Sequence, residues 1–387
     1  MTAASPPTLS DVLGVLDALY PPALAEPWDA VGLVVGQPAQ LVTRVAFAVD
    51  PTPQVVAEAV AWGADLLVVH HPLLLRPVHG VPSTGPTGRV VWELVKNDCA
   101  LFTAHTNADA AVGGVNDALA DALGLQDNRP LVPAGGELFD KIVTFVPPEH
   151  TQQVADAMTD LGAGTIGEYL RCTWSIVGDG SFLPTQRARP LIGEPGRVER
   201  TPEARLEVRA PRRMREQVVR ALVAAHPYEE AAYDVYELSP APRGVGLGRI
   251  GQLPEPRRLA DFVQHVAEVL PTTGSGVRFT GDPDAIVRTI AVCGGAGGST
   301  IPDAGRAGAD VLVTGDLRHH VALDEVVGGG PALVDAGHFA TEWPWLPRAA
   351  RSLVAALAEV GTTVETRVST LVTDPWTASV PSREEPR

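Results

Sequence analysis

GADLLVVHHP at residues 63–72 and GADVLVTGD at residues 308–316 are two copies of one pattern. Each copy follows a short apolar run, RVAFAVD at 44–50 or RTIAVCGG at 288–295. The gapless alignment pairs Val45 with Ile290, Gly63 with Gly308, Asp65 with Asp310 and His71 with Asp316. In the first copy, PQVVAEAVAWG at 53–63 reads as a crossover helix between the two apolar runs, so we expect a β-α-β unit with parallel strands.

Each copy is followed by another apolar run that ends in His-x-x-x-carboxylate. ALFTAHTNAD at 100–109 supplies His105 and Asp109, and ALVDAGHFATE at 332–342 supplies His338 and Glu342. The two runs differ by one residue in register because Gly337 precedes His338. Open α/β sheets place their sites at the carboxyl ends of strands. A duplication whose halves both supply His and carboxylate therefore predicts one shared site between two lobes.

The composition favours a cytoplasmic globular protein of two or three domains. A hydrophobic content of 45% over 387 residues is ample for buried cores. Neither a membrane-spanning apolar run nor a secretion signal is indicated. The formal charge of −16 disfavours nucleic acid as a partner. The three cysteines lack C-x-x-C spacing and are expected to be small buried hydrophobic residues: Cys99, Cys172 and Cys293.

The chain is expected to form a core that an insert interrupts. LSDVLGVLDALY at 9–20 predicts an opening helix with Ser10 as its N-cap. The repeated pattern does not occur between residues 137 and 238. Strand and helix signals in β-α-β, β-α-β order there predict a ferredoxin-like α+β domain. We therefore expect duplicated α/β lobes forming one core domain. The predicted parts are the core at 1–136 and 239–376, the insert at 137–238 and a disordered tail at 377–387.

Six side chains at the predicted strand ends carry the candidate chemistry: His70, His71, His105, Asp109, His338 and Glu342. A lone histidine at such a position is more often a hydrogen-bonded core residue, and Asp109 alone could cap the following helix. Four histidines and two carboxylates together exceed the needs of one ion and are typical of a dinuclear site for divalent Zn, Fe or Mn. Two such ions would make a water nucleophile available near neutral pH, which favours hydrolysis.

Three further motifs leave alternatives open. In TGDLRHH at 314–320, Asp316, His319 and His320 either orient ligands or transfer protons, or are solvated loop residues. GGAGG at 294–298 lacks the GxGxxG spacing of a phosphate-binding loop, which favours a plain tight turn. HPYEE at 226–230 contains a histidine and two carboxylates, and we expect it to cap and order the insert rather than bind metal.

Several of these motifs, in their order and spacing, resemble a known family. They are WDAVGL at 28–33, GADLLVVHHPLL at 63–74, HTNADAAVGGVNDALA at 105–120, TGDLRHH and DAGHFATE at 335–342. This set is similar to the motifs of the NGG-one interacting factor three family, whose bacterial members are called GTP cyclohydrolase one, type two homologues. The middle segment, with AHPYEEAAYDVYEL at 225–238, looks like the PII-like or CutA-like insert of longer bacterial members. The resemblance implies a toroidal homohexamer with two divalent ions per subunit facing an internal cavity.

Carried across motif by motif, the resemblance implies a set of metal ligands: His70, His71, Asp109, His338 and Glu342. It places His105 in the pocket near the ions, and it matches His320 to the histidine that follows the family's TGD motif. Both are candidate catalytic residues that move protons. The family often has Asn after Trp-Asp, where this chain has Ala30. If this Asn has a role at the family's site, another residue must fill that role in this chain, or the role is absent.

The leading hypothesis is a metal-dependent hydrolase with Asp109 and Glu342 bridging the ions. By resemblance alone, its substrate is a nucleotide such as GTP, opened at the imidazole ring. A phosphoesterase that uses the same ions is the nearest enzymatic alternative. The other class of hypothesis is a metal-binding regulatory or scaffold hexamer without turnover, whose insert senses a small ligand. A membrane or nucleic-acid partner is not expected under any of these hypotheses.

Overall fold

The computed structural model describes residues 6–134, 138–239 and 244–380. The chain forms two compact units, a core unit of Met1–Ala134 with Gly244–Arg387 and an inserted unit of Gly135–Arg243. The expected boundary at residues 136 and 137 lies outside the described residues, as do parts of the expected link to the second half and of the tail. None of the helices in the described ranges is long and apolar enough to cross a membrane. The described residues form a mixed α/β structure with three sheets.

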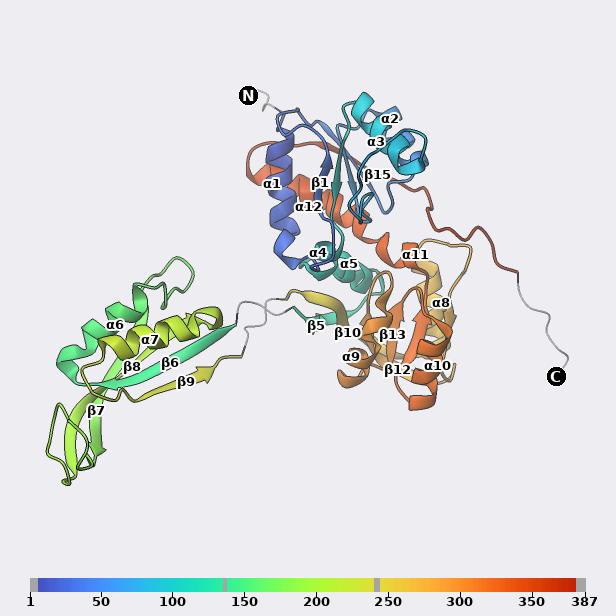
Figure 1. The fold of residues 1–387 in the computed structure, drawn as a ribbon. Coiled ribbons are helices and arrows are strands. Elements are labelled where there is room, and N and C mark those ends of the chain that lie inside the picture. Colours follow the sequence, from blue (N-terminus) through green and yellow to red (C-terminus); the bar gives the residue numbers. More distant parts are fainter. Residues whose placement is uncertain (1–5, 135–137, 240–243, 381–387) are drawn as a thin grey trace. The chain divides into compact units, whose positions relative to one another are not determined.

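The first sheet of the core unit is built around the first repeat (Figure 1). Across the sheet, its strands are β1 (Gly32–Val35), β4 (Ala100–Thr103), β3 (Leu66–Val69), β2 (Arg44–Ala48) and β15 (Glu365–Val368). β2, β3, β4 and β15 run parallel, and β1 pairs antiparallel with β4. Helix α2 (Pro53–Trp62) links β2 to β3, which confirms the predicted β-α-β unit.

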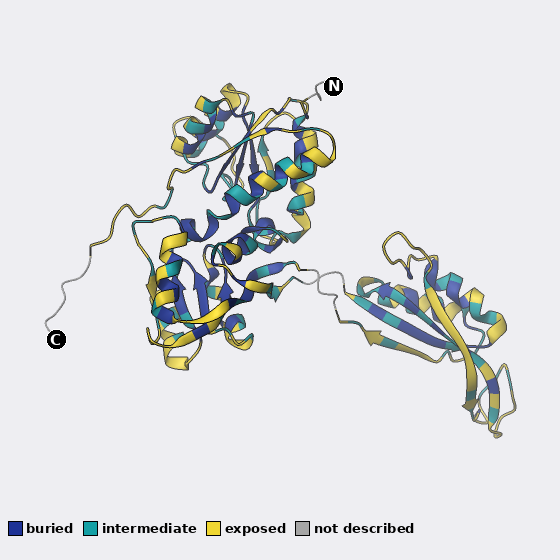
Figure 2. Ribbon diagram, turned by 180° about the vertical axis from the view of Figure 1, so that it is seen from behind, coloured by how far each residue is buried: buried dark blue, intermediate teal, exposed yellow. Residues whose placement is uncertain are grey.

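Helices cover both faces of this sheet because side chains alternate along each strand. α1 (Leu9–Leu19) and α12 (Trp345–Glu359) pack on the face that contains Phe47. α2 and α3 (Pro86–Lys96) pack on the opposite face, which contains Ala48. Figure 2 shows the resulting buried strands beneath helices whose outer faces are exposed.

The second sheet is built around the second repeat. Across the sheet, its strands are β11 (Arg278–Phe279), β14 (Ala332–Asp335), β13 (Val311–Thr314), β12 (Ile286–Val292), β10 (Gly246–Arg258) and β5 (Gln126–Pro133). β12, β13 and β14 are parallel and the others pair antiparallel. α5 (Val115–Ala122) and α8 (Leu259–Val269) pack on one face, and α9 (Ile301–Arg306) and α10 (His319–Gly328) on the other. Each repeat therefore forms its own three-layered lobe.

Both repeats contain the same contact between an aspartate side chain and two backbone N–H groups. The Asp65 carboxylate accepts hydrogen bonds from the backbone N–H groups of Thr43 and Arg44, at 2.6 and 2.9 Å. In the second repeat, the Asp310 carboxylate accepts from the backbone N–H groups of Arg288 and Thr289, at 2.8 Å each. The gapless alignment pairs these two residues with Thr43 and Arg44. The two halves are thus duplicated in structure as well as in sequence.

The inserted unit is an antiparallel sheet covered on one face by two helices. Its elements in chain order are β6 (Phe139–Val146), α6 (Thr151–Thr159), β7 (Thr173–Phe182), β8 (Glu199–Pro211), α7 (Arg215–Ala225) and β9 (Tyr233–Glu237). The sheet order is β7-β8-β6-β9, so each helix connects two strands that are not neighbours. This is the β-α-β-β-α-β order of a split β-α-β arrangement.

The N-cap of α1 is Thr8, and the expectation of Ser10 is wrong. The Thr8 hydroxyl accepts from the Asp11 backbone N–H, and the Asp11 carboxylate accepts from the Thr8 N–H, which makes a reciprocal capping box. We expect Thr8→Ala to lower the free energy of unfolding of the core unit by about 1 kcal/mol. Ser10→Ala is the matched control and should change it little. Chemical denaturation of both variants checks this, and an equal effect of the two would contradict it.

Two of the three cysteines are buried, as expected. Cys99 and Cys293 lie in the core unit with 2% of their surface exposed. Cys172 is only partly buried. It precedes β7, an edge strand of the inserted unit whose residues are mostly exposed, so the expectation of a buried side chain is wrong there.

Candidate metal centre

The six candidate residues meet where the carboxyl ends of the parallel strands of both lobes face each other. His70 and His71 follow β3, and His105 and Asp109 follow β4, in and beside the short helix α4 (Thr106–Ala110). His338 and Glu342 begin and end α11 (His338–Glu342), which follows β14. Strand ends are where the backbone of an open α/β sheet leaves room for a site. The structure therefore brings all six side chains together from four different loops and helices.

Each of the four histidines is held through its Nδ1 atom by an oxygen atom. His70 Nδ1 lies 2.9 Å from the Ala104 carbonyl, and the other three contact carboxylates. These pairs are His71 with Asp50 at 2.7 Å, His105 with Asp29 at 2.8 Å and His338 with Asp316 at 2.7 Å. Because an oxygen acceptor requires a proton on Nδ1, the Nε2 atom of each neutral ring is left with its lone pair. This is the orientation that metal-ligating histidines adopt.

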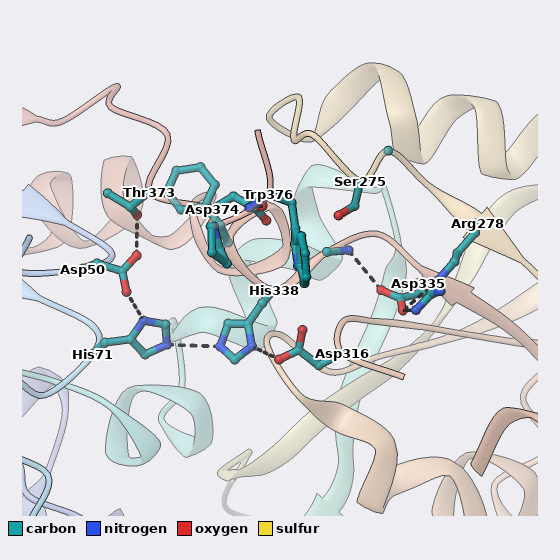
Figure 3. Close-up of a pocket in the computed structure, with 14 residues that line it drawn as sticks. Asp50, His71, Ser275, Arg278, Asp316, Asp335, His338, Thr373, Asp374 and Trp376 are labelled. Carbon is teal, nitrogen blue, oxygen red and sulfur yellow. Dashed lines mark hydrogen bonds and ion pairs between the residues drawn. The ribbon is translucent and has the colours of Figure 1, made fainter. Parts of the chain in front are cut away.

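The Nε2 atoms converge on the Glu342 carboxylate. His338 Nε2 lies 3.1 Å and His70 Nε2 3.4 Å from Glu342 Oε1, and His71 Nε2 lies 3.2 Å from Oε2. The Nε2 atoms of His71 and His338 are 3.2 Å apart, as the row of dashed contacts from Asp50 to Asp316 in Figure 3 shows. If both ring nitrogens carried a proton, neither could accept from the other, and each would need a Glu342 oxygen, at 3.2 or 3.1 Å, as its acceptor.

The cluster contains buried polar atoms that the described side chains and backbone do not satisfy. His70 Nε2, Asp109 Oδ1 and Glu342 Oε2 form no hydrogen bond with the described residues, because in the Nδ1–H tautomer the nearby Nε2 atoms have no proton to donate to the carboxylates. Buried polar atoms nearly always have a partner, so each such atom needs an explanation. Imidazole nitrogens and carboxylate oxygens are the ligands that Zn²⁺ and similar ions prefer. A divalent cation fits this donor set because it would satisfy all three atoms.

Ligand atoms within 4.8 Å of one another form two groups that could each hold an ion. The first is His70, His71 and His105, and the second is His71, His338 and Glu342. His105, which the resemblance places only beside the ions, is thus close enough to be a ligand. Asp109 is in neither group, but its Oδ1 atom lies 3.7 Å from His70 Nε2. Which of the two completes the first group stays a prediction.

The electrostatics of the cluster are dominated by the buried Glu342 carboxylate, which is 3% exposed. Burial opposes protonation of His71 and His338, but the attraction of Glu342 outweighs it and raises their pKa values to about 11 and about 9. Burial likewise opposes ionisation of Glu342, yet His71 and His70 hold its pKa well below the usual value. Burial raises the pKa of Asp109 to about 6. Positive charge therefore stabilises the buried carboxylates of the cluster. A bound cation would supply this charge in place of the protons on the histidines.

The glycine-rich segment at 294–298 packs directly against the cluster. A Cβ atom at Gly295 would overlap Glu342 Oε1, and the φ of +64° disfavours a side chain there as well. The segment is held by the Asn116 side chain, which accepts from the Gly294 N–H at 2.8 Å and donates to the Asp109 carbonyl at 2.9 Å. The expectation of a plain tight turn therefore missed a close approach of the backbone to the site.

The structure separates the residues of TGDLRHH. Asp316 is the partner of His338 Nδ1, which supports its interpretation as a residue that orients a ligand. His319 and His320 begin α10, are exposed and contact each other edge to face. Among the described contacts, none joins His320 to the cluster, so its catalytic role stays a prediction. In HPYEE, His226 Nε2 donates to the Phe145 carbonyl at 3.0 Å, and its Nδ1 accepts from the Tyr228 backbone N–H, so the histidine orders the inserted unit.

Two partners of the cluster were not predicted from the sequence. Asp29 holds both His105 and the backbone N–H of Thr106, and Asp50 holds His71. Asp29 stands in the WDAVGL motif, and Asp50 ends the quoted run RVAFAVD, so both lay in motifs already singled out. Ala30, where the family often has Asn, donates its backbone N–H to Asp29 at 2.7 Å. The carboxylate before it thus supports the site.

A cavity of about 460 Å³ opens beside His71 and His338. It is lined by parts of both lobes and by the segment near Trp376, as Figure 3 shows. This volume lies in the range of pockets that hold small organic ligands. Two of the candidate metal ligands, His71 and His338, are therefore accessible to a molecule of that size.

Asp316→Asn is expected to weaken metal binding by roughly 10- to 100-fold, because an amide orients His338 Nδ1 less well than a carboxylate does. Asn tolerates the left-handed conformation of residue 316, whose φ is +55°, so the fold should be preserved. Asp324→Asn, at an exposed position of α10, is the matched control. Competition for Zn²⁺ with a chelating dye measures the affinities. Equal affinities of Asp316→Asn and the parent would exclude this orienting role.

Comparison with known proteins places this geometry in a family. Residues 7–375 match the profile of Duf34/NIF3 (NGG1p interacting factor 3). A Mycobacterium tuberculosis protein called GTP cyclohydrolase 1 type 2 homolog is 48% identical over 369 residues, covering 95% of this chain and 96% of that protein. A Bacillus subtilis protein of the same name is 40% identical over 329 residues, covering 85% and 87%. The crystal structure of a Bacillus cereus protein related to NIF3 has a TM-score of 0.69 and 39% identity, covering 97% of this chain and all of that one (100%).

Proposed function

The chain belongs to the Duf34/NIF3 family, and from its site we propose that it is a cytoplasmic hydrolase that uses two divalent metal ions. The observation that carries the proposal is the convergence of His70, His71 and His338 on the buried Glu342 carboxylate, with His105 beside them and unpartnered atoms on His70, Asp109 and Glu342. The two groups of ligand atoms are neighbours, which supports two adjacent ions, and His71, a member of both groups, can give its Nε2 lone pair to only one of them. The proposed ligands are His70, His71, Asp109, His338 and Glu342.

The chain's own residues prepare the site for hydrolysis. Zn²⁺, Fe²⁺ or Mn²⁺ at these ligands would supply Lewis acidity and lower the pKa of a water molecule. Asp50 and Asp316 keep His71 and His338 in the tautomer that leaves Nε2 free. Burial and the neighbouring His70 lower the pKa of His105, so its ring is neutral near pH 7. His105 is therefore suited to take a proton from water and return it to the leaving group.

The proposed substrate is a nucleotide such as GTP. This choice is supported by the name shared by the M. tuberculosis and B. subtilis relatives. Water that adds to the carbon between the two imidazole nitrogens opens the ring to a formamide, and the proton released in the addition passes to the ring nitrogen that leaves. The step needs a cation that polarises the ring and a group that transfers a proton. The proposed ligands would hold the cation, and His105 would transfer the proton.

The proposal includes an assembly and an insert of defined type. By family membership we expect a toroidal homohexamer, with a mass in solution of six times the chain mass of 40.7 kDa. The β-α-β-β-α-β order of the inserted unit supports a PII-like or CutA-like module. Multi-angle light scattering of the purified protein tests the assembly, and a monomer or dimer would refute it.

Turnover by the metal-loaded protein tests the reaction. We expect a formamide product from GTP by mass spectrometry, and a fall in kcat of about 10²- to 10⁴-fold in His105→Ala. Metal content measured on the same samples separates lost chemistry from lost ions. Hydrolysis of bis(4-nitrophenyl) phosphate without a GTP product would favour the phosphoesterase. A metal-replete protein that turns over neither compound would refute the hydrolase and favour a regulatory or scaffold role.

A further inference from the structure

An exposed indole lies in the cavity beside the metal ligands. Trp376 lines the same cavity as His71 and His338 and has 66% of its surface exposed. Figure 3 shows its ring between Ser275 and His338. A tryptophan with this exposure adds little to the core, and its flat face is available to a ligand. Its position therefore calls for an explanation in terms of binding.

The segment that carries the indole is fixed to the first lobe. The Ser369 hydroxyl donates to the Glu58 carboxylate at 2.5 Å, and the Thr373 hydroxyl donates to Asp50. Asp50 is also the partner of His71 Nδ1, so one carboxylate holds both a candidate metal ligand and this segment. The Trp376 backbone N–H donates to Asp374 Oδ1 at 2.8 Å. The backbone that carries the indole is therefore held at the cavity by these contacts.

The charges around the indole disfavour a phosphate group beside it. Four carboxylates line the cavity: Asp50, Asp316, Asp335 and Asp374. Arg278 is the one guanidinium among its described lining residues, and it is paired with Asp335 at 2.7 Å. An uncharged group next to Trp376 needs no cation, whereas the cations available to an anion are the ions proposed at His71 and His338 and the already paired Arg278.

We propose that Trp376 stacks on a planar, uncharged heteroaromatic ring and so presents that ring to the metal ligands. Stacking on an aromatic side chain is favourable for every nucleobase and needs no charge. The inference deepens the proposed function and rests on it for the identity of the cavity as the substrate pocket. It assigns recognition of the substrate to its ring rather than to its phosphates.

Isothermal titration of the metal-loaded, full-length chain with guanosine tests the proposal. We expect guanosine to bind, and ribose 5-phosphate to fail to compete with it. Trp376→Ala should weaken guanosine binding by roughly tenfold or more, and Trp376→Phe should retain most of the affinity because it keeps an aromatic face. Failure of the parent protein to bind guanosine, or equal affinities of the parent and Trp376→Ala, would overturn the proposal.

Two controls separate stacking from general damage. Trp174→Ala removes an exposed tryptophan of the inserted unit and should leave guanosine affinity unchanged. Gly274→Ala keeps the indole but displaces it, because a Cβ there would overlap the Trp376 carbonyl oxygen. It should weaken binding as Trp376→Ala does. An effect of Gly274→Ala with none of Trp376→Ala would assign recognition to another part of the segment and overturn the proposal.

The binding assay and the turnover assay fail independently. Guanosine binding that depends on Trp376, without turnover of GTP, would refute the hydrolase and leave the ring-binding site standing. Turnover of GTP with unchanged KM in Trp376→Ala would refute stacking and leave the hydrolase standing. Metal content is measured in each variant, so that loss of ions is not mistaken for loss of the stacking contact.

Discussion

Glu342→Gln is expected to weaken metal binding by more than the roughly 10- to 100-fold that is typical when a residue that only supports a ligand is replaced. Glu342 contacts the Nε2 atoms of His70, His71 and His338 and is the central negative charge of the cluster. Glutamine keeps the shape of the side chain but removes the charge, so it cannot offset a divalent cation. Elemental mass spectrometry of protein purified without chelator measures the metal retained.

The comparison uses a matched control and a stronger variant. Glu359→Gln makes the same change at an exposed position of α12 and should retain as much metal as the parent, for which the proposed centre predicts about two ions per chain. The double variant Asp109→Ala, Glu342→Ala should retain almost none. Retention of the parent's metal content by the double variant would exclude these carboxylates as ligands. Little metal in the parent, even after reconstitution, would count against the metal centre itself.

The candidate residues were predictable because the signals for them are local. His70 and His71 directly follow an apolar strand, and a repeat 245 positions later marks the same strand end. Strand ends of parallel sheets meet at one edge, so residues that follow them are expected to gather. The structure confirms that gathering. Their roles as metal ligands and proton carriers stay predictions.

The one-residue shift between the two His-x-x-x-carboxylate motifs has a structural meaning. The Ala104 N–H donates to the Val69 carbonyl, and the Ala336 N–H donates to the Thr314 carbonyl, at equivalent points of the two repeats. The residue after each is His105 in the first repeat and Gly337 in the second. His338 therefore lies inside the first turn of α11, whereas His105 precedes α4. The two histidines occupy different positions around the cluster in spite of their equal spacing.

The two halves also differ for a steric reason. The position equivalent to His70 in the gapless alignment is Gly315. A Cβ atom at Gly315 would come within 2.7 Å of the His338 backbone nitrogen. The second repeat cannot place a histidine there, so it contributes Asp316 as a partner of His338 and leaves the histidine pair to the first repeat. A sequence repeat alone does not show this crowding.

Two of the carboxylates that orient the histidines, Asp29 and Asp50, were not predicted, whereas Asp316 was already a candidate from its motif. Asp29 lies 76 residues from His105, and Asp50 lies 21 residues from His71. No periodic pattern relates such residues, and only the folded backbone brings them together. Arg249 was missed for a related reason. Its partner Asp117 lies 132 residues away in the sequence.

Arg249→Met is expected to destabilise the core unit by about 3–5 kcal/mol. Arg249 lies on β10, is 1% exposed and forms two hydrogen bonds with Asp117, at 2.5 and 3.0 Å. Its other N–H groups donate to the carbonyls of Ala111, Gly246 and Gly248 at 2.7–3.0 Å. Methionine fills much of the volume but leaves these acceptors and the Asp117 charge without their partner. Calorimetry should show a lower transition temperature for the core unit.

Arg258→Met, at the far end of β10, is the matched control. Its exposed pair with Asp284 is worth at most about 1 kcal/mol, so the same substitution should have a small effect there. Asp117→Leu combined with Arg249→Met should recover only part of the loss, because the three backbone carbonyls still lack a donor. Equal effects of the two arginine variants would refute the structural importance of Arg249.

The Arg249 substitution also tests whether the metal centre and the fold are coupled. Asp117 is adjacent in α5 to Asn116, whose side chain joins the Asp109 carbonyl to the Gly294 N–H at the cluster. If the ions bind only the folded core, saturating metal should raise the stability of the Arg249→Met variant as it does that of the parent. A variant that folds but no longer gains stability from metal would show that Arg249 positions the cluster through α5. A variant that gains as much as the parent would confine its role to the fold.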